Sequence, residues 1–181
     1  LSGVIVMDVV DSSLTVVHDA PTLFPIGDTV VTFTATDDQG NTESDSATVT
    51  VTDTTVPTIQ PPMAVTVEGD TTGGAVSTGA EIVAFLAGVV SSDIVDDMVT
   101  VTNDAPLLFP VGGTFVTFIA TDDQGNSSST ASTVTVVDTT APSISAPANI
   151  TVEGEATGGA AESNAAIVAF LAGAAGSDIV D

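Results

Sequence analysis

The chain has 181 residues, with 24 Asp and Glu, one His and no Lys or Arg, so its formal net charge is −24. A surface of this charge cannot neutralise phosphates, which excludes nucleic-acid binding, and anionic membrane surfaces repel it for the same reason. No apolar run reaches the roughly 18 residues of a membrane span. There is no Cys, which removes disulfides, thiol redox chemistry and thiolate zinc sites from consideration.

A period of 85 residues organises the whole sequence. The segment 53–57 (DTTVP) returns at 138–142 (DTTAP), and the run TDDQGN at 36–41 returns at 121–126 with no insertion. Such self-similarity indicates tandem repeats of one structural unit. We therefore predict a partial repeat at 1–52, a complete repeat at 53–137 and a second partial repeat at 138–181. The partial units would be completed by a neighbouring chain or by further sequence.

Short strands bounded by Gly and Pro are predicted throughout each repeat. Val and Thr dominate, and the turn residues recur at regular spacing, which is typical of β-sandwiches. The run 82–90 is compatible with a strand or a helix, and its β-rich surroundings favour a strand kinked at Gly88. In chain order, the predicted strands include 65–68, 82–90, 98–102, 114–121, 130–137 and 150–153.

The strongest alternation lies in the two strands that flank the run DDQGN. Apolar residues at every second position predict that 116, 118 and 120 face the core, with 134 and 136 opposite them. The equivalents Val31, Phe33 and Ala35 repeat the pattern one period earlier. The expected fold is all-β, with tandem immunoglobulin-like sandwiches.

Four segments together resemble the HYR (hyalin repeat) family, in its bacterial type. They are the DTT-x-P linkers, NDAP to FPVG at 103–112, ATDDQGN at 120–126 and VTVVDTTAP at 134–142. The resemblance implies an immunoglobulin-like sandwich in extracellular, often adhesive, multi-domain proteins, and it implies no catalysis. Animal members of the family carry a Cys pair that this chain lacks, so no disulfide supports the core here.

No enzyme signature is present. The Ser residues have no His or Lys partner that could activate them. The single His18 corresponds to Asn103 in the next repeat, which indicates an ordinary loop or strand-end residue. We predict that the chain is not an enzyme.

Acidic residues recur at one end of each predicted sandwich. The loop with Asp93 and Asp96, the loop 122–126 and the linker residue Asp53 all arrive there in an immunoglobulin-like fold. Calcium binds six to eight oxygens of carboxylate, amide and carbonyl groups, so Ca²⁺ is the predicted ligand. The alternative is that each Asp closes an Asx turn. The candidate ligands are Asp8, Asp11, Asp37, Asp38, Asp53, Asp93, Asp96, Asp122, Asp123, Asn126, Asp138, Asp178 and Asp181.

Two places where the repeats differ suggest contacts between chains. The segment Val4, Ile5, Val6, Met7 is more apolar than its equivalents, which suggests a strand that adds to the open edge of another copy. Phe115 and Ile119 replace Val and Thr at outward positions and could form a lateral apolar patch, or be scattered surface residues.

The predicted function is a structural repeat of an extracellular fibre or cell-surface filament. Copies would assemble head to tail, and heterologous contacts of this kind propagate into filaments. One alternative is an adhesin stalk or surface binding module. A glycan ligand is disfavoured because the chain has no Trp or Tyr platform. Another alternative is an accessory region of a large secreted enzyme.

Overall fold

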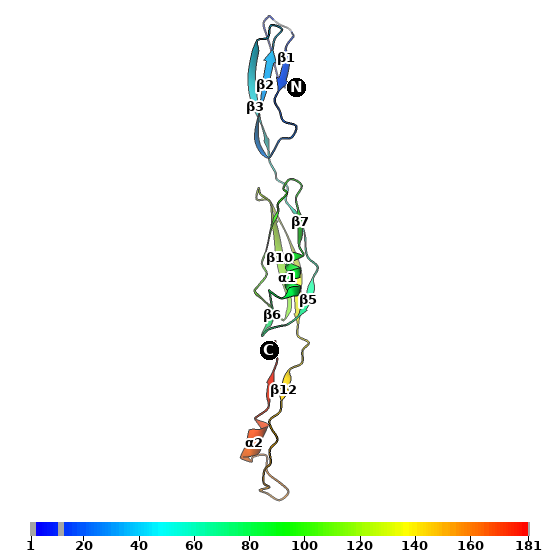
Figure 1. Ribbon diagram of the computed structural model, residues 1–181, viewed down its shortest axis with the longest axis vertical. Helices are drawn as coiled ribbons and strands as arrows, with labels where there is room; N and C mark the ends of the chain where they lie inside the picture. Colours follow the sequence, from blue (N-terminus) through cyan, green and yellow to red (C-terminus); the bar gives the residue numbers. More distant parts are fainter. Residues whose placement is uncertain (1–2, 11–12, 181) are drawn as a thin grey trace. The chain divides into compact units, whose positions relative to one another are not determined.

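The computed structural model describes residues 3–10 and 13–180, and it divides into two compact units, Leu1–Thr55 and Val56–Asp181 (Figure 1). The described residues form thirteen strands and two short helices. The predicted all-β class is confirmed. No described helix has the length and hydropathy that crossing a membrane requires.

The first unit is a three-stranded antiparallel sheet in the order β1-β2-β3. Its strands are β1 (Thr15–His18), β2 (Gly27–Thr36) and β3 (Thr42–Val51). The turn between β2 and β3 contains Gly40 with φ +87°, a conformation that glycine adopts without a Cβ penalty. Val31 is buried, whereas Phe33 and Ala35 are only half-buried. The inward side of β2 thus follows the predicted alternation, but other residues of the unit cover it only in part.

The second unit contains a four-stranded sheet in the order β5-β11-β10-β8. Its strands are β5 (Val65–Glu68), β8 (Thr100–Asn103), β10 (Gly112–Thr121) and β11 (Ser127–Val137). β5 pairs parallel with β11, and the other neighbours are antiparallel. The predicted inward residues of β10 and β11 are all buried: Val116, Phe118, Ala120, Val134 and Val136.

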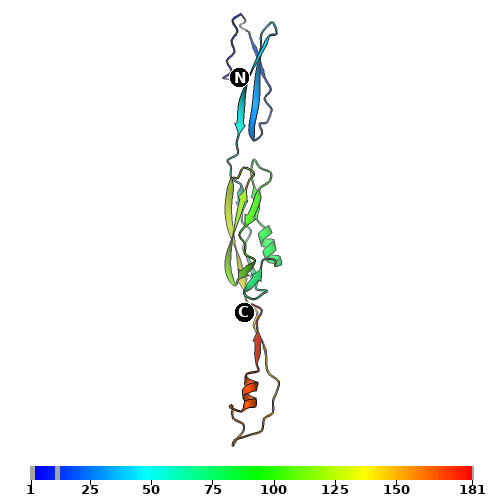
Figure 2. The same cartoon turned by 90° about the vertical axis from the view of Figure 1, so that its left-hand side faces the viewer.

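A second layer of short elements covers the inward face of this sheet. It consists of β4 (Thr58–Gln60) paired with β7 (Val90–Ser92), β6 (Gly74–Val76) paired with β9 (Leu108–Pro110), and α1 (Ala80–Ala87). Figure 2 shows α1 beside the sheet. The rings of Phe85 and Phe118 meet edge to face with centroids 5.9 Å apart. The core of the sandwich lies between these two layers.

The predicted strand at 82–90 is wrong, because most of this segment is the helix α1. Ile82 and Phe85 are three residues apart and both are buried, with Leu86 and Val89 packed against the same core. Within the helix, Ile82, Phe85 and Leu86 have the spacing i, i+3, i+4 of one helical face, and this pattern competed with the β-rich surroundings in the prediction. The helix ends at Gly88 and the chain resumes as β7.

Residues 138–180 belong to the second unit and repeat only part of its structure. β12 (Ser143–Ser145) pairs with β13 (Ala175–Ser177), and α2 (Ala165–Leu171) repeats α1. The predicted strand at 150–153 is wrong, since no strand forms there. Its equivalent β5 exists by pairing with β11, and no strand is paired with 150–153 among the described residues.

Replacing Phe118 by Ala should lower the free energy of unfolding by about 3–5 kcal/mol, because Phe118 is 0% exposed and its removal leaves a cavity beside Phe85. Phe115 on the same strand is 78% exposed, so F115A should change stability by less than about 0.5 kcal/mol. Urea denaturation followed by circular dichroism measures both. Equal losses for the two variants would contradict the assigned register of β10.

Candidate functional site

The acidic turn between β10 and β11 is held by its own hydrogen bonds. Asp122 Oδ1 accepts the N–H groups of Gln124 and Asn126 at 3.0 and 2.7 Å, and the Asn126 amide donates to Asp122 Oδ2 at 2.8 Å. Burial raises the pKa of Asp122, but the hydrogen bonds from Asn126, Gln124 and Gly125 outweigh it, so the pKa lies below its usual value. The carboxylate therefore stays ionised as the acceptor that closes the turn.

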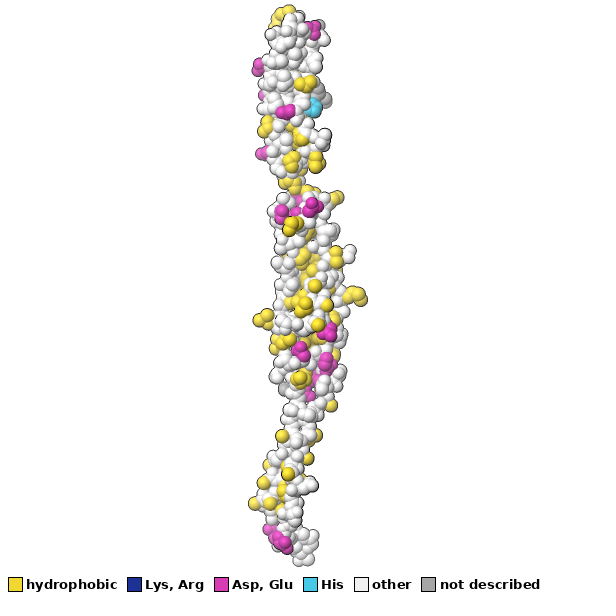
Figure 3. All heavy atoms as spheres, viewed as in Figure 1, with side chains coloured by type: hydrophobic (Ala, Val, Ile, Leu, Met, Phe, Trp, Pro, Cys, Tyr) yellow, Lys and Arg dark blue, Asp and Glu magenta, His cyan; other side chains and the backbone are white. Residues whose placement is uncertain are grey.

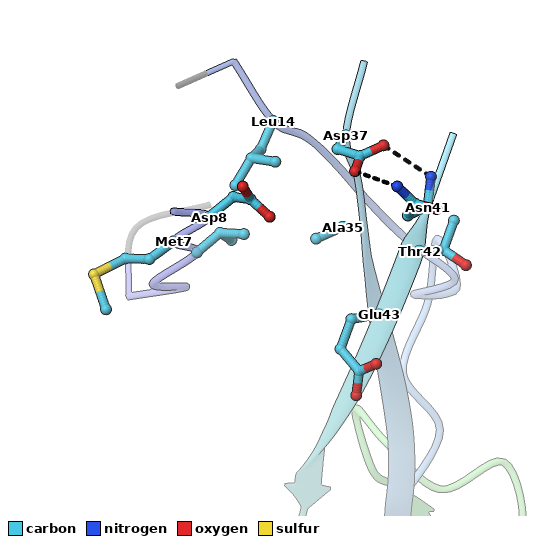
Figure 4. A pocket seen from close by; sticks show the side chains of 9 residues that line it. Met7, Asp8, Leu14, Ala35, Asp37, Asn41, Thr42 and Glu43 are labelled. Atoms are coloured by element: carbon cyan, nitrogen blue, oxygen red, sulfur yellow. Dashed lines mark hydrogen bonds between the residues drawn. The ribbon is translucent and has the colours of Figure 1, made fainter. Parts of the chain in front are cut away.

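The same turn recurs in the first unit. Asp37 Oδ1 accepts from Gln39 and Asn41, and the Asn41 side chain donates to Asp37 Oδ2 at 2.7 Å (Figure 4). These bonds, chiefly those from Asn41, hold the pKa of Asp37 below its usual value.

His18 makes the same hydrogen bond as its equivalent Asn103 in the next repeat. Its Nδ1 accepts the N–H of Ala20, and Asn103 Oδ1 accepts the N–H of Ala105.

The structure brings two of the three predicted calcium segments together. Asp96 Oδ2 accepts the N–H of Asp123 at 2.7 Å, which joins the loop after β7 to the turn after β10. Asp93 Oδ1 accepts the N–H groups of Val95 and Asp96 at 2.8 and 3.3 Å, while its Oδ2 is buried without a hydrogen-bond partner. Asp53 belongs to the first unit, where its Oδ1 accepts the N–H of Thr55.

The remaining candidate ligands are spread along the chain. Asp8, Asp138 and Asp178 each accept the N–H two residues ahead, and the side chains of Asp38 and Asp123 are exposed. Asp11 and Asp181 lie outside the described residues. Within the described ranges, no group of three or more His, Cys, Asp or Glu side chains could hold a metal ion. Calcium binding stays a prediction, beside the Asx turns that these contacts show.

The contact between the complete repeat and residues 138–140 centres on Glu68, which sequence reasoning did not single out. Its carboxylate accepts the N–H of Thr139 at 2.7 Å, the Thr139 hydroxyl at 2.9 Å and the Thr140 hydroxyl at 3.2 Å. The backbone and then the hydroxyl of Thr139 are the main causes that lower the pKa of Glu68. The sequence feature that could have identified Glu68 is the repetition of Val67-Glu68-Gly69 at 152–154.

Val180 completes this junction from the other side. It is 4% exposed, and its carbonyl accepts the N–H of Gly73 at 2.7 Å. A Cβ at Gly69 would lie 2.8 Å from Val180 Cγ2, so glycine is needed for Val180 to fit. We call Glu68 with the loop Gly69–Gly74 the socket, and Val180 with Thr139 and Thr140 the plug.

The first unit leaves part of its apolar face open. Val31 and Phe33 line a pocket of about 210 Å³ together with Phe24 and Val49. In the second unit the equivalents Val116, Phe118 and Phe109 are buried under the short elements and α1. The same type of sheet face is therefore fully covered in the second unit and only partly covered in the first, where Val31 is buried and Phe24 and Phe33 are half-buried.

In residues 138–180, the apolar side chains of the covering elements are the ones that lack full burial. Ile167 and Phe170 of α2 are only half-buried, whereas their equivalents Ile82 and Phe85 are buried. A Cβ at Gly74 would lie 1.9 Å from the carbonyl oxygen of Phe109, yet the equivalent Gly159 has no atom within 4 Å of such a Cβ. The elements that cover the sheet in the complete repeat thus lack a sheet here.

The two predicted interface segments lie in different units. Val4, Ile5, Val6 and Met7 form no strand, and they line a pocket of about 250 Å³ with Phe33 and other residues of the first unit. Met7 and Asp8 also line the pocket drawn in Figure 4. Phe115 and Ile119 of β10 are exposed, as predicted for outward positions. Figure 3 shows apolar and acidic side chains and the single His on the visible surface, and no Lys or Arg.

No protein-family model matches the chain. Hyalin from Lytechinus variegatus is 36% identical over 163 residues, which is 81% of this chain and 30% of that protein. Hyalin from Strongylocentrotus purpuratus is 37% identical over 140 residues, 73% of this chain and 11% of that protein. This similarity suggests a hyalin-repeat-like family. The bacterial type stays a prediction.

Among solved structures, the protocadherin gammaB7 EC3-6 cis-dimer structure has a TM-score of 0.35 and 18% sequence identity. The match covers 75% of this chain and 45% of that one. A likeness at this level carries no argument about this chain. The chain spans less than a third of the length of either hyalin, so the activities and partners of those whole proteins are not transferred to it.

The Glu68 contact predicts a pH dependence. The pKa of Glu68 is lower in the folded chain than in the unfolded chain. Its contribution to the free energy of unfolding is therefore fully present above the unfolded-state pKa, and it is lost as the pH falls through the folded-state pKa. E68Q should therefore destabilise the chain at neutral pH, and the difference from the unsubstituted chain should vanish in acid. The matched control is E153Q at the equivalent exposed residue, assayed at low concentration. Thermal unfolding at several pH values measures the effect, and a pH-independent difference would argue against it.

Proposed function

We propose that the chain is a structural repeat module of an extracellular fibre or cell-surface filament, in which copies associate head to tail. Hyalin is an extracellular cell-surface protein, and the location of this chain is extracellular. The hyalin similarity also fits a non-catalytic, adhesion-type β-domain. An adhesin stalk is the alternative that the same similarity supports, and association of the chain distinguishes the two.

One observation carries the assembly proposal: the chain exposes both halves of an interface that it forms internally. The sheet face of the first unit lacks the cover that β4–β7, β6 and α1 provide in the complete repeat. Residues 138–180 contain the equivalents of that cover, with their own apolar side chains half-exposed. In the proposed assembly, residues 138–180 of one copy cover residues 13–52 of another.

The complete repeat sets the register of this association. Ala75 pairs with Phe109 and Val76 with Leu108 in the β6–β9 ladder. One period away, the corresponding pairs are Ala160 with Phe24 and Ala161 with Leu23. By the same shift, the parallel pairing of β5 with β11 would place 150–153 of one copy along 49–52 of the other.

The burial of apolar side chains must drive this association, because two acidic copies repel each other electrostatically. Burying the half-exposed Phe24 and Phe33 against Ile167 and Phe170 removes apolar area from water, worth about 25 cal/mol per Å². Salt screens the repulsion between exposed carboxylates, so association strengthens as ionic strength rises. The segment Val4–Met7 covers part of the sheet face, and it leaves when the second copy binds. Its apolar side chains then become free for the predicted strand addition.

Cysteine pairs test the register in a chain that has no Cys of its own. The double variant L23C/A161C should form disulfide-linked ladders under mild oxidation, because the two Cα positions face each other in the proposed ladder. The matched control V30C/A161C places the first Cys on the outward side of β2, where Val30 is exposed, and should give no ladder. Denaturing gels with and without reductant measure this. A monomer by sedimentation at moderate salt, with no ladder for either pair, would remove the assembly proposal.

Calcium is a separate proposal, favoured by the buried Asp93 Oδ2 that has no hydrogen-bond partner. Asp93 would be one ligand, with loop oxygens near Asp96 completing the set. Calcium at 100 times its dissociation constant would stabilise the fold by about 2.7 kcal/mol. We expect a higher unfolding temperature in calcium than in EGTA, and D93N should abolish the difference. The control D45N, on exposed β3, should retain it; an unsubstituted chain that is indifferent to calcium would refute the site.

A further inference from the structure

The outward face of the sheet in the complete repeat carries two large apolar side chains that contact water. Phe115 is 78% exposed and Ile119 is 43% exposed, and they lie four residues apart on the same side of β10. The complete repeat has both of its layers, and the second layer covers the opposite, inward face of the sheet. The exposure of these two side chains therefore belongs to a finished repeat and does not come from a missing part of one.

The same face is almost free of charge, although the chain carries 24 acidic residues. Apart from Phe115 and Ile119, the outward positions of β8, β10 and β11 hold only Ser, Thr, Ala, Gly and one Val. Two carboxylates lie at its margins and both accept hydrogen bonds, Asp104 from the N–H of Thr117 at 2.7 Å and Glu68 from residues 139 and 140. Two chains that repel each other through their net charge can touch most easily over such a surface.

The first unit lacks this combination on the equivalent face of its sheet. Its equivalent positions hold Val30, Thr34 and Asp28, where the complete repeat has Phe115, Ile119 and a glycine. All three differences make the face of the complete repeat more apolar or less charged. The two repeats therefore differ at the positions that would decide whether this face can bind another surface.

We propose that two copies of this chain pack side by side through this face, with their β10 strands antiparallel and Thr117 on a two-fold axis. Phe115 of each copy then lies over Ile119 of the other, because both residues stand two positions from the axis. Ser129, which pairs with Ile119 on β11, is small and leaves room for the incoming ring. The contact is isologous, so both copies bury the same side chains. It goes beyond the head-to-tail association, because it joins chains laterally and uses no residue of either partial repeat.

A second copy is the occupant that the charges favour. A cationic partner would be drawn to the carboxylates of the loops, whereas a copy of this chain offers an uncharged face of the same size. The ten residues of β10 and the neighbouring β11 cover only about 34 Å by 10 Å, which is small for a stable dimer. A single contact is therefore weak, and successive repeats in aligned arrays would add to it through their high effective concentration.

Single cysteine variants of the full chain locate the two-fold axis. T117C should give covalent dimers with a short bismaleimide, which is needed because packed sheets lie about 10 Å apart, beyond the reach of a disulfide. The matched control T121C changes a residue on the same strand and face. Its two copies would be eight residues of strand apart, about 27 Å, and should give few dimers. Salt should raise the T117C yield on denaturing gels, because it screens the repulsion between the chains.

The double variant F115T/T117C tests the aromatic ring. Thr retains a high β propensity, and a symmetric dimer loses two rings, so the dimer yield should fall by about tenfold or more. Circular dichroism should show an unchanged fold, because Phe115 is 78% exposed. The matched control V30T/T117C changes the equivalent side chain of the first unit and should crosslink as T117C does.

Two results would overturn the lateral contact. One is a T117C yield no higher than that of T121C, and the other is an equal yield for T117C and F115T/T117C. In either case the face binds something other than a second copy, or nothing. The L23C/A161C ladder tests the head-to-tail association separately, so failure of one contact leaves the other standing.

Discussion

The inward face of the β10–β11 hairpin is the constraint on which the rest of the structure depends. Its Val and Phe side chains can leave water only when a second layer covers them, and one hairpin cannot supply that layer. In the complete repeat the cover comes from residues that precede the hairpin in sequence, namely β4, β6, α1 and β7. The first unit has the hairpin without this cover, and residues 138–180 have the cover without a hairpin. In both segments, apolar side chains that are buried in the complete repeat have half-buried equivalents.

The absence of Lys and Arg changes what the carboxylates can do. In most proteins an acidic surface is balanced by basic side chains, whereas here the partners seen are backbone N–H groups, hydroxyls and the Asn amides. Asp37 and Asp122 hold their turns in this way, and the lowered pKa of each follows from these hydrogen bonds. Acidic residues therefore have a structural role as hydrogen-bond acceptors in several loops. That role accounts for their periodic recurrence without requiring a metal at each one.

The socket and plug show how glycine at one position permits a contact between repeats. Gly69 gives Val180 the space to bury, and Glu68 holds the linker that leads to the next repeat. The contact combines a buried apolar side chain with hydrogen bonds to a charged acceptor, which are stronger than those between neutral groups. Short linkers and contacts of this type would restrict motion between successive repeats. A fixed period along the sequence would then become a fixed spacing in an assembled array.

The sequence by itself determined the repeat period, the β class and the inward residues of β10 and β11, because period and strand alternation are local properties. It also located the acidic turns, since Asp, Gly and Asn at these spacings specify turn geometry. It did not decide between helix and strand at 82–90, where the core selected the helical face with Ile82 and Phe85. Nor could it show that 150–153 lacks a strand, since strand formation there depends on pairing with a distant segment. The contacts of Glu68 and Val180 join residues far apart in the chain, and only the tertiary structure brought them together.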